Sequence, residues 1–458
     1  MLIPRDLLEK YNKAVPRYTS YPPANFFSDR ASEKSVGELL QASNSDKPEN
    51  ISLYVHIPFC PQLCFYCGCN TTITRNKAWM GEYLQALKQE IIMVAGQLAQ
   101  HRKVTQIHWG GGTPNYLTSR QIEEIMHLFK DNFRWAENPE VAIEVNPAYL
   151  TKDYVDELLE AGFNRFSIGI QDFKTEVLDA VNRAHPSMPV KELTDYIRRD
   201  GRASVNLDFI YGLPYQNEKS FRETIKQALA IQPDRLVTFS YAHVPWFKKA
   251  QKKLEKHGLP SADEKLRLFE NAFELMTENG YVPIGLDHFA QPGDELSVAL
   301  RNNRLHRNFQ GYATRQTTGQ VYAFGTSAIS QLDSAYLQNT KDVNTYINKM
   351  SENTWAVDKT YEVNRREKVL REVINDVMCN RRLSWEDVAL RRNLKVDEVK
   401  DSTAVTNEAL EGFESDGLIE QTEDGIIVTD RGRFFIRNIA AAYDPLVKET
   451  DKHFSKSI

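Results

Sequence analysis

The sequence predicts an α/β fold, a partial (β/α)6 barrel of the TIM type with an N-terminal arm and a mostly helical, winged-helix-like C-terminal domain. Three observations favour this fold class. Short apolar runs rich in β-branched residues alternate with longer amphipathic stretches, which is the pattern of βαβ units around a parallel sheet. Polar or glycine-rich residues follow each apolar run, as they do at the carboxyl rim of a barrel. The alternation fades after about residue 290.

The predicted barrel occupies residues 49–290. Its expected strands cover residues 51–56, 104–109, 141–145, 165–170, 204–211 and 235–241. Its expected helices cover residues 78–98, 119–132, 152–161, 174–181, 191–200 and 218–231. A further helix is predicted over residues 261–279, with Ser261 placed to cap its start, and residues 282–286 are a candidate for another strand.

Residues 1–48 form the predicted arm, which is too short and too rich in proline for a domain. One interpretation is a strap packed on the surface. The other is a lid, because Arg17, Tyr18 and Tyr21 could reach a flat, anionic ligand.

Two regions follow the barrel. Residues 291–361 are expected to form a loop-rich extension that covers the active site. Residues 362–458 are predicted to form several helices, then a small hairpin and a last helix, which is the order of a winged helix. Winged helices often bind DNA, but this segment lacks an obvious basic recognition helix. A structural cap is therefore favoured over a DNA reader.

The composition limits the function classes. The 458 residues carry a formal net charge of -5, which argues against a nucleic-acid-binding protein that relies on a global basic field. No apolar run approaches the ~18 residues of a membrane span, and the N-terminus does not resemble a signal peptide. The five cysteines are few and clustered, which indicates a reducing compartment, so we expect a cytoplasmic protein and, by default, a monomer.

The cysteine pattern is the strongest chemical signal. Four of the five cysteines lie within ten positions, and Cys60, Cys64 and Cys67 form a C-x3-C-x2-C loop. Thiolates hold iron–sulfur clusters, and a [4Fe–4S] cluster takes four ligands, so three cysteines leave one iron open. A zinc knuckle is the alternative, but no second pair of ligands completes a tetrahedral site. Cys69 is interpreted as a cysteine that does not bind the cluster, because one short loop would otherwise have to supply the ligands at all four corners of the cluster.

Other rim residues have weaker signals. The turn from Gly110 to Pro114 would let backbone groups approach a ligand, and no Walker lysine follows it. Glu144, Asp172 and Asp208 stand at strand ends, where they are either helix caps or ligand contacts: Asp208 could bind ribose hydroxyls and Glu144 an ammonium group. Two arginines, Arg183 and Arg307, are either carboxylate clamps or surface ion pairs.

The cysteine loop resembles that of radical S-adenosylmethionine (SAM) enzymes. A wider set of motifs resembles the oxygen-independent coproporphyrinogen III oxidases, also called coproporphyrinogen dehydrogenases. These motifs begin at Pro16, His108, Gly169, Val181, Asp208, Tyr241, Asp287 and Leu305. The arm and the segment from Leu305 to Tyr312 favour this family over its shorter relatives, which include a heme chaperone.

The resemblance implies that Cys60, Cys64 and Cys67 hold a [4Fe–4S] cluster whose fourth iron binds SAM. It implies oxidative decarboxylation of two propionate side chains of coproporphyrinogen III to vinyl groups. The product would be protoporphyrinogen IX, in anaerobic heme and porphyrin biosynthesis. The radical would be generated at the cluster-bound SAM, and a reduced donor such as flavodoxin or ferredoxin would supply the electron.

Family members are similar in holding a second SAM. The residues that match positions contacting one or the other SAM are Tyr54, Tyr66, Gly111, Gly112, Thr113, Glu144, Gln171, Arg183, Asp208, Ala242 and Ile329. The sequence departs from the family pattern at Phe65-Tyr66, where the aromatic residues stand in the opposite order, and at Asn146 and Ala148. Two alternatives stay open, a heme-opening methyltransferase of the same superfamily and a heme chaperone paralogue.

Overall fold

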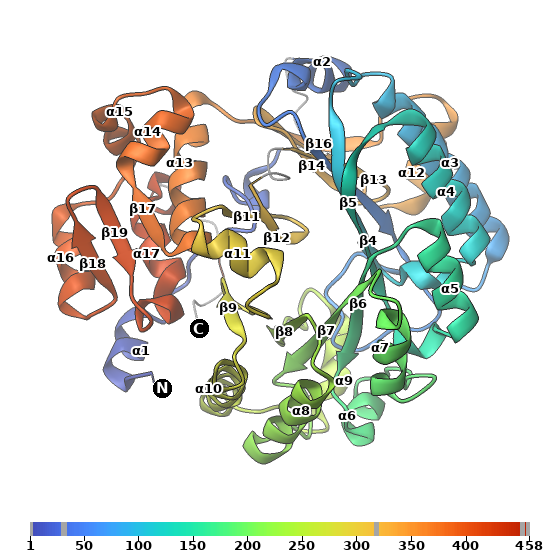
Figure 1. The fold of residues 1–458 in the computed structure, drawn as a ribbon, viewed down its shortest axis with the longest axis horizontal. Coiled ribbons are helices and arrows are strands. Elements are labelled where there is room, and N and C mark those ends of the chain that lie inside the picture. Colours follow the sequence, from blue (N-terminus) through green and yellow to red (C-terminus); the bar gives the residue numbers. More distant parts are fainter. Residues whose placement is uncertain (1–2, 29–33, 316–319, 449–453, 455–458) are drawn as a thin grey trace.

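The computed structural model describes residues 3–28, 34–315, 320–448 and 454. Within this part of the chain one large sheet runs in the order β16-β15-β14-β13-β1-β4-β5-β6-β7-β8-β10-β9. Figure 1 shows this sheet with its helices beside the smaller C-terminal part in orange and red.

Six strands of the sheet are the predicted barrel strands, and neighbours among them pair in parallel. They are β1 (Ile51–Ile57), β4 (Lys103–Gly111), β5 (Arg134–Val145), β6 (Arg165–Gln171), β7 (Ser204–Tyr211) and β8 (Arg235–Ser240). The α/β prediction with a parallel core is therefore confirmed. The strand β5 begins well before its predicted start, because the polar residues ahead of residue 141 carry no apolar signal.

The helices that connect these strands lie on the outside of the sheet (Figure 1). They are α3 (Lys77–Ala95), α4 (Ser119–Asn132), α5 (Lys152–Ala161), α6 (Thr175–Ala180), α7 (Val190–Arg198) and α8 (Glu218–Ile231). Local capping explains several of their ends. Thr118 and Gln121 form a capping box at the start of α4, and Gly162 ends α5 with a φ of 104°.

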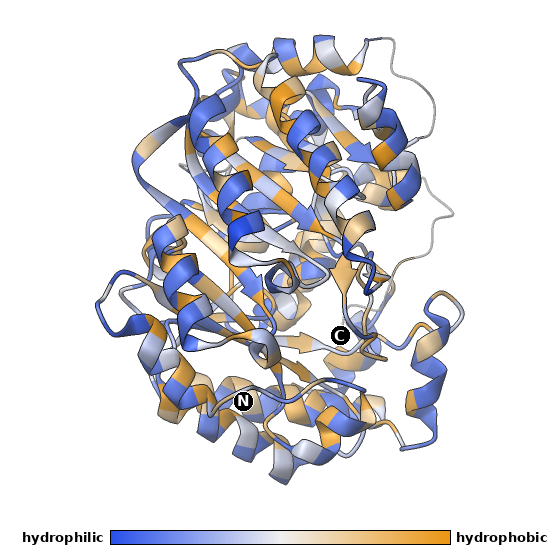
Figure 2. Cartoon of the chain, turned by 90° about the vertical axis from the view of Figure 1, so that its right-hand side faces the viewer, coloured by the Kyte–Doolittle hydropathy of each residue, from blue (hydrophilic) through white to orange (hydrophobic). Residues whose placement is uncertain are grey.

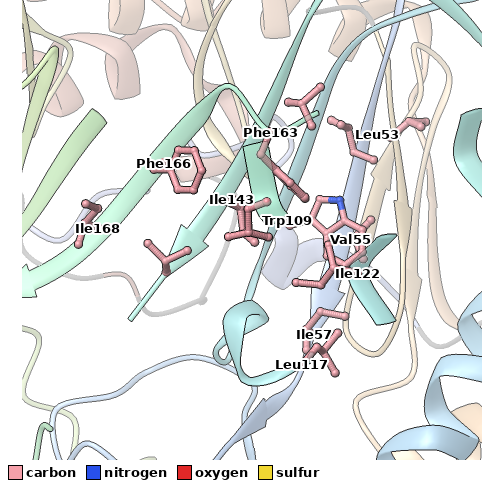
Figure 3. Packing of buried hydrophobic residues seen from close by; sticks show 14 of the residues in the cluster. Leu53, Val55, Ile57, Trp109, Leu117, Ile122, Ile143, Phe163, Phe166 and Ile168 are labelled. Carbon is pink, nitrogen blue, oxygen red and sulfur yellow. The ribbon is translucent and has the colours of Figure 1, made fainter. Parts of the chain in front are cut away.

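Alternation along the strands divides the sheet into two faces. Leu53, Ile143 and Phe166 point outward into the core between sheet and helices, where Trp109 packs edge-on against Phe163 at 5.9 Å (Figure 3). Figure 2 shows hydrophobic and hydrophilic residues alternating along both helices and strands, as expected of elements with one buried and one exposed face. The opposite face of the strands is left to line the interior of the barrel.

Beyond β8 the chain adds a short helix, a long helix and two antiparallel strands. These are α9 (Lys252–Glu255), α10 (Ala262–Glu278), β9 (Val282–Ile284) and β10 (His288–Ala290), of which β10 pairs with β8. Ser261 caps α10 in a capping box with Glu264, as predicted from the sequence.

The prediction of a loop-rich segment over residues 291–361 is wrong. The segment contains α11 (Glu295–Arg301), β11 (Leu305–Asn308), β12 (Gly311–Thr314), β13 (Gln320–Phe324), β14 (Ile329–Gln331), β15 (Ala335–Asn339), α12 (Val343–Ser351) and β16 (Val357–Glu362). Strand β13 pairs in parallel with β1 and extends the barrel sheet. These strands are too short to show a clear period in the sequence, and tertiary pairing decides their conformation.

The C-terminal part has the helix-then-hairpin order expected of it. It contains α13 (Arg365–Asn375), β17 (Arg382–Ser384), α14 (Trp385–Arg392), α15 (Val396–Ser402), α16 (Asn407–Ser415), β18 (Ile419–Thr422), β19 (Gly425–Val428), α17 (Ile436–Tyr443) and α18 (Pro445–Lys448). The strands form a separate antiparallel sheet in the order β17-β19-β18.

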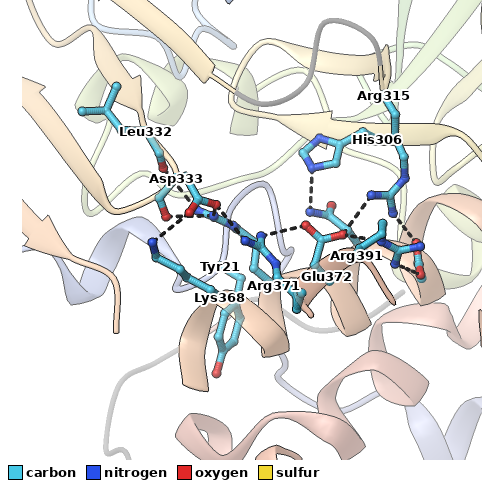
Figure 4. Close-up of polar contacts among 12 residues, drawn as sticks. Tyr21, His306, Arg315, Leu332, Asp333, Lys368, Arg371, Glu372 and Arg391 are labelled. Atoms are coloured by element: carbon cyan, nitrogen blue, oxygen red, sulfur yellow. Dashed lines mark hydrogen bonds and ion pairs between the residues drawn. The ribbon is translucent and has the colours of Figure 1, made fainter. Parts of the chain in front are cut away.

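A network of ion pairs joins the extension to the C-terminal part (Figure 4). Glu372 on α13 accepts hydrogen bonds from Arg315 at 2.8 Å and from Arg391 at 3.0 Å. Asp333, which follows β14, accepts one from Arg371 at 2.7 Å. Glu372 and Arg371 are buried and their partners Arg315 and Asp333 are partly buried, so these ion pairs join the C-terminal part to the sheet extension away from bulk solvent.

The arm, with its helices α1 (Arg5–Tyr11) and α2 (Val36–Ala42), packs as a strap. The hydroxyls of Tyr18 and Tyr21 each donate to the buried carboxylate of Asp444 at 2.9 Å. Both rings are almost fully buried, so neither is placed to reach a ligand, and the lid interpretation of these tyrosines is wrong. Arg17 donates to Asp287 at 2.6 Å. Among the described helices, none is long and apolar enough to span a membrane.

Candidate active site

A cavity of about 400 Å³ fills the interior of the barrel and opens beside the cysteine loop. Its walls come from the inner face of β4 to β8, the cysteine loop and the β11–β12 hairpin. Since parallel strands end at one rim, this is the place where a β/α barrel builds its active site.

The three cysteines of the predicted motif face this cavity together. Cys60 ends β2 (Phe59–Cys60), which pairs with β3 (Thr72–Ile73), and a turn with a 3.0 Å bond from the Cys67 amide to the Cys64 carbonyl closes the loop. The Sγ of Cys60 lies 3.2 Å from Oγ1 of Thr113. The loop therefore presents three sulfur atoms to one space.

Neighbouring segments hold the loop on two sides. On one side the Phe65 amide donates to the carbonyl of Val181 at 2.9 Å, and Asn182 donates to the carbonyl of Leu63 at 2.7 Å. On the other side Gln251 donates to the carbonyl of Tyr66 at 3.1 Å. These contacts fix the backbone of the loop before any ligand is bound.

The donor set fits an iron–sulfur cluster. Thiolates are the ligands that such clusters take, and each thiolate binds a different iron of the cube, so the ligands need not converge on one point. Among the described residues, no three His, Cys, Asp or Glu side chains are grouped to hold a single metal ion. Burial raises the pKa of the Cys60 thiol to about 11, whereas hydrogen bonding from Cys69 lowers the pKa of Cys67.

Three consecutive glycines make the turn after β4 possible. A Cβ on Gly112 would lie 2.7 Å from the carbonyl oxygen of Pro58, and one on Gly110 would lie 2.8 Å from the carboxylate of Glu144. Gly111 has a φ of 113°, a conformation that favours glycine. The turn thus threads between the cysteine loop and Glu144, and the Gly111 amide donates to that carboxylate at 3.3 Å.

Inward-facing polar residues form a layer at the rim. Nε2 of His108 lies 3.0 Å from Oε1 of Glu144, and the ring of Tyr54 stacks on His108 with centroids 6.0 Å apart. Burial lowers the pKa of His108, but the hydrogen bond and charge of Glu144 outweigh it and raise the pKa overall. Burial raises the pKa of Asp208 to about 6, against the hydrogen bond that Ser167 donates at 2.8 Å.

Arg183 connects the cysteine loop to β6. Its Nη1 donates to the hydroxyl of Tyr66 at 3.0 Å and lies 3.7 Å from Sγ of Cys64, and its Nη2 donates to the carbonyl of Gly169. A Cβ on Gly169 would meet this guanidinium at 2.9 Å. The arrangement places a cation beside the loop, where an anionic group of a ligand could pair with it.

Most of the predicted site residues line the cavity. They are Cys60, Cys64, Cys67, Tyr66, Gly111, Gly112, Thr113, Glu144, Gln171, Arg183 and Asp208. Three do not: Tyr54 lies behind His108, Ala242 is exposed with its carbonyl bonded to Gln251, and Ile329 packs on β14 beside the Phe27 cluster. Their ligand contacts stay predictions.

Of the two sequence interpretations of Asp172, a structural carboxylate or a ligand contact, the contacts favour the structural one. It is 1% exposed and accepts hydrogen bonds from Gln216 at 2.7 Å, from Thr224 at 2.8 Å and from the Lys174 amide at 2.9 Å. These bonds tie β6 to α8, so Asp172 is structural.

Sequence reasoning missed the floor of the cavity. Arg165 donates to Glu140 at 2.6 Å, and Arg235 donates to Asp294 and Glu295 at 2.9 Å each. A signal was present, because Glu140 stands four positions before the predicted rim residue Glu144 on one strand, and residues an even number of positions apart on a strand share one face.

Comparisons with known proteins agree with this site. Residues 54–228 match the family model of the Radical SAM superfamily, and residues 363–435 match that of the HemN C-terminal domain. The oxygen-independent coproporphyrinogen III oxidase of Synechocystis sp. is 43% identical over 456 residues, 99% of this chain and 97% of the relative. That of Escherichia coli is 41% identical over 443 residues, 97% of this chain and 95% of the relative.

A solved structure is similar over the whole chain. The coproporphyrinogen III oxidase (HemN) of Escherichia coli, described as a radical SAM enzyme, matches with a TM-score of 0.87 and 38% identity, covering 97% of this chain and 99% of that one. The fold and the cysteine loop thus define a radical SAM enzyme, a class that uses a [4Fe–4S] cluster and SAM. Within that class, the chain belongs to the oxygen-independent coproporphyrinogen III oxidase family.

Proposed function

We propose that this enzyme converts two propionate side chains of coproporphyrinogen III to vinyl groups by oxidative decarboxylation, giving protoporphyrinogen IX. The observation that carries the proposal is the cysteine loop facing the barrel cavity, in a chain that spans nearly the full length of relatives bearing this name. The agreement extends through the arm and the C-terminal part, which favours the oxidase over the methyltransferase and chaperone alternatives.

The cluster ligands in this proposal are Cys60, Cys64 and Cys67. When bound, the cluster and SAM supply the radical chemistry that removes a hydrogen atom from a propionate side chain. The protein's own residues would bind the polar groups of the ligand and orient them. Arg183 would pair with a carboxylate, Glu144 would accept from an ammonium group, and Asp208 would accept from ribose hydroxyls.

Apolar side chains would shield one side of the cysteine loop from water. Phe65 and Tyr66, which lie between the cluster cysteines, pack into a small apolar core with Val177, Val181 and Leu254. Keeping water from this side of the site would reduce side reactions of reactive intermediates.

The partners belong to the same proposal. Coproporphyrinogen III is the substrate, and a reduced one-electron carrier such as flavodoxin or ferredoxin delivers the electron. We place the enzyme in the cytoplasm on the clustering of its few cysteines, and we take a monomer as the default oligomeric state.

An anaerobic product assay tests this function. Reconstituted protein is incubated with coproporphyrinogen III, SAM and a reductant, and the porphyrin products are separated by chromatography. Vinyl product that depends on SAM is expected. SAM cleavage without decarboxylation contradicts the proposal, methyl transfer to heme would indicate the methyltransferase, and tight heme binding without SAM turnover would indicate the chaperone.

A further inference from the structure

A lysine-rich segment of the chain contacts the cysteine loop directly. We name residues 245–257 the lysine loop; it follows the end of β8 and contains α9. It carries five lysines against one glutamate, a formal charge of +4 in a chain whose total is -5. This local charge is opposite in sign to that of the molecule as a whole.

The lysine loop is anchored to the residues that surround the cluster site. Lys248 donates to the carbonyl of Cys69 at 2.8 Å, and Lys253 lies over the ring of Phe65, 4.4 Å from its centroid. Leu254 is fully buried in the same small core as Phe65 and Tyr66. The lysine loop thus packs directly against the segment that carries the cluster cysteines.

The tip of the lysine loop exposes two adjacent aromatic side chains. Trp246 is 78% exposed and Phe247 is 72% exposed, the highest values for any aromatic residue in the described part of the chain. Lys249, Lys252 and Lys256 are exposed beside them. Aromatic residues within a charged rim are the composition of protein interfaces, and small interfaces of this kind are typical of transient redox encounters.

We propose that the lysine loop is the docking surface for a small acidic protein that carries one electron to the cluster. The inference rests on the proposed function, which needs such a carrier. Positive charge beside the cysteine loop would steer an acidic carrier to this face of a protein that otherwise repels it. The exposed aromatic pair would then contact the carrier's apolar surface near its redox centre, and the anchoring through Lys248 and Leu254 keeps the docking position fixed relative to the cluster.

Two sets of charge-reversal variants test the docking surface. The first is K249E/K252E/K256E, which spares the two lysines that contact the cysteine loop. The matched control is K103E/K226E/K400E, three exposed lysines outside the lysine loop with the same change in net charge. The probes are an acidic flavodoxin and an acidic [2Fe–2S] ferredoxin, titrated against cluster-loaded enzyme at low and high salt without substrate.

We expect the wild type to bind at least one probe with an affinity that falls as salt rises. The first variant should bind that probe at least tenfold more weakly, and its cluster should be reduced by the reduced carrier at least tenfold more slowly. Reduction by dithionite, which needs no docking, should be unchanged in both variants. W246A/F247A should weaken binding with little change in its salt dependence.

Several outcomes would overturn the proposal. These are no salt-dependent binding of either carrier to the wild type, or equal losses in the two lysine variants. Anionic phosphatidylglycerol vesicles provide a third arm: loss of vesicle binding in the first variant with unchanged carrier binding would assign the surface to lipid instead. If dithionite reduction is lost in the first variant, the neutral K249Q/K252Q/K256Q replaces it. Carrier binding as expected without vinyl product would contradict the proposed function and leave the docking surface standing.

Discussion

The guanidinium of Arg183 donates a 3.0 Å hydrogen bond to the hydroxyl of Tyr66, joining the β6 side of the barrel to the residue between two cluster cysteines. Both side chains line the cavity, and the same guanidinium lies 3.7 Å from Sγ of Cys64. One partly buried cation therefore contacts the cysteine loop and faces the ligand space.

Replacing Arg183 by Ala should weaken SAM binding and spare the cluster. A charge-assisted hydrogen bond is worth about 1.5–3 kcal/mol, so SAM affinity should fall by about 10- to 100-fold. Equilibrium binding of SAM and methionine release measure the effect, and iron and sulfide content serve as the control. The variant Y66F keeps the ring and removes the hydroxyl, so it should lose less SAM affinity than R183A. An R183A protein that binds SAM normally would remove Arg183 from the SAM site.

Substitution should distinguish the cysteines that bind the cluster from the one that does not. C64A should lose the cluster, because two thiolates cannot replace three, whereas C69S should retain it, since Cys69 is interpreted as a cysteine that does not bind the cluster. Iron and acid-labile sulfide per chain, measured after anaerobic reconstitution, decide between them. Cluster loss in C69S would make Cys69 a ligand.

Gly112 should not tolerate a side chain. In G112A the new Cβ meets the carbonyl of Pro58 at 2.7 Å, and relief of such overpacking costs about 1–3 kcal/mol in the free energy of unfolding. The cysteine loop should shift, so cluster content should also fall. The matched control is G68A in the same loop, where nothing lies within 4 Å of the added Cβ. Thermal unfolding and iron content are the measurements, and equal behaviour of the two variants would contradict the packing argument.

How much of the site could be predicted depended on the range of the interaction. The cysteine loop and the glycine turn are local in sequence, and their chemistry was readable from residue types alone. The pairing of β13 with β1 joins segments about 270 residues apart, and no local pattern encodes it. The role of Asp172 shows the same limit: the sequence left it open between a structural carboxylate and a ligand contact, because its partner Thr224 lies on another unit of the barrel.

Glu90 should make stability depend on pH. This buried carboxylate on α3 accepts hydrogen bonds from the Gly325 amide, Asn339 and Tyr346, yet burial raises its pKa from 4.5 to about 7. The folded state thus holds the proton more tightly than the unfolded state. The stability from this group is present below about pH 4.5 and is lost as pH rises to about 7, by about 3 kcal/mol. Urea unfolding of E90Q across this range should lack that loss, while E82Q, at an exposed position on the same helix, should keep it.

The attachment of the C-terminal part should depend on Glu372. Its carboxylate accepts from Arg315, Arg391 and Arg392 at 2.8–3.0 Å. Burial alone would raise its pKa, but the three arginines hold the pKa well below the ordinary value of 4.5. Its stabilising contribution is therefore present above pH 4.5 and is lost as pH falls toward the lowered pKa.

E372Q should accordingly destabilise the protein by about 1.5–3 kcal/mol near neutral pH, the range for a hydrogen bond to a charged group. The loss is limited because each arginine keeps a second carboxylate partner, Asp376 for Arg315 and Arg391 and Asp333 for Arg392. The matched control is E398Q, which removes an exposed pair with Arg365 and should cost less than about 1 kcal/mol. Urea unfolding at pH 7 and again in acid measures both. The difference in the free energy of unfolding between E372Q and the wild type should become smaller in acid, because protonation of Glu372 removes from the wild type the charge that the variant already lacks. A difference that stays constant with pH would assign the loss of stability to packing rather than to charge.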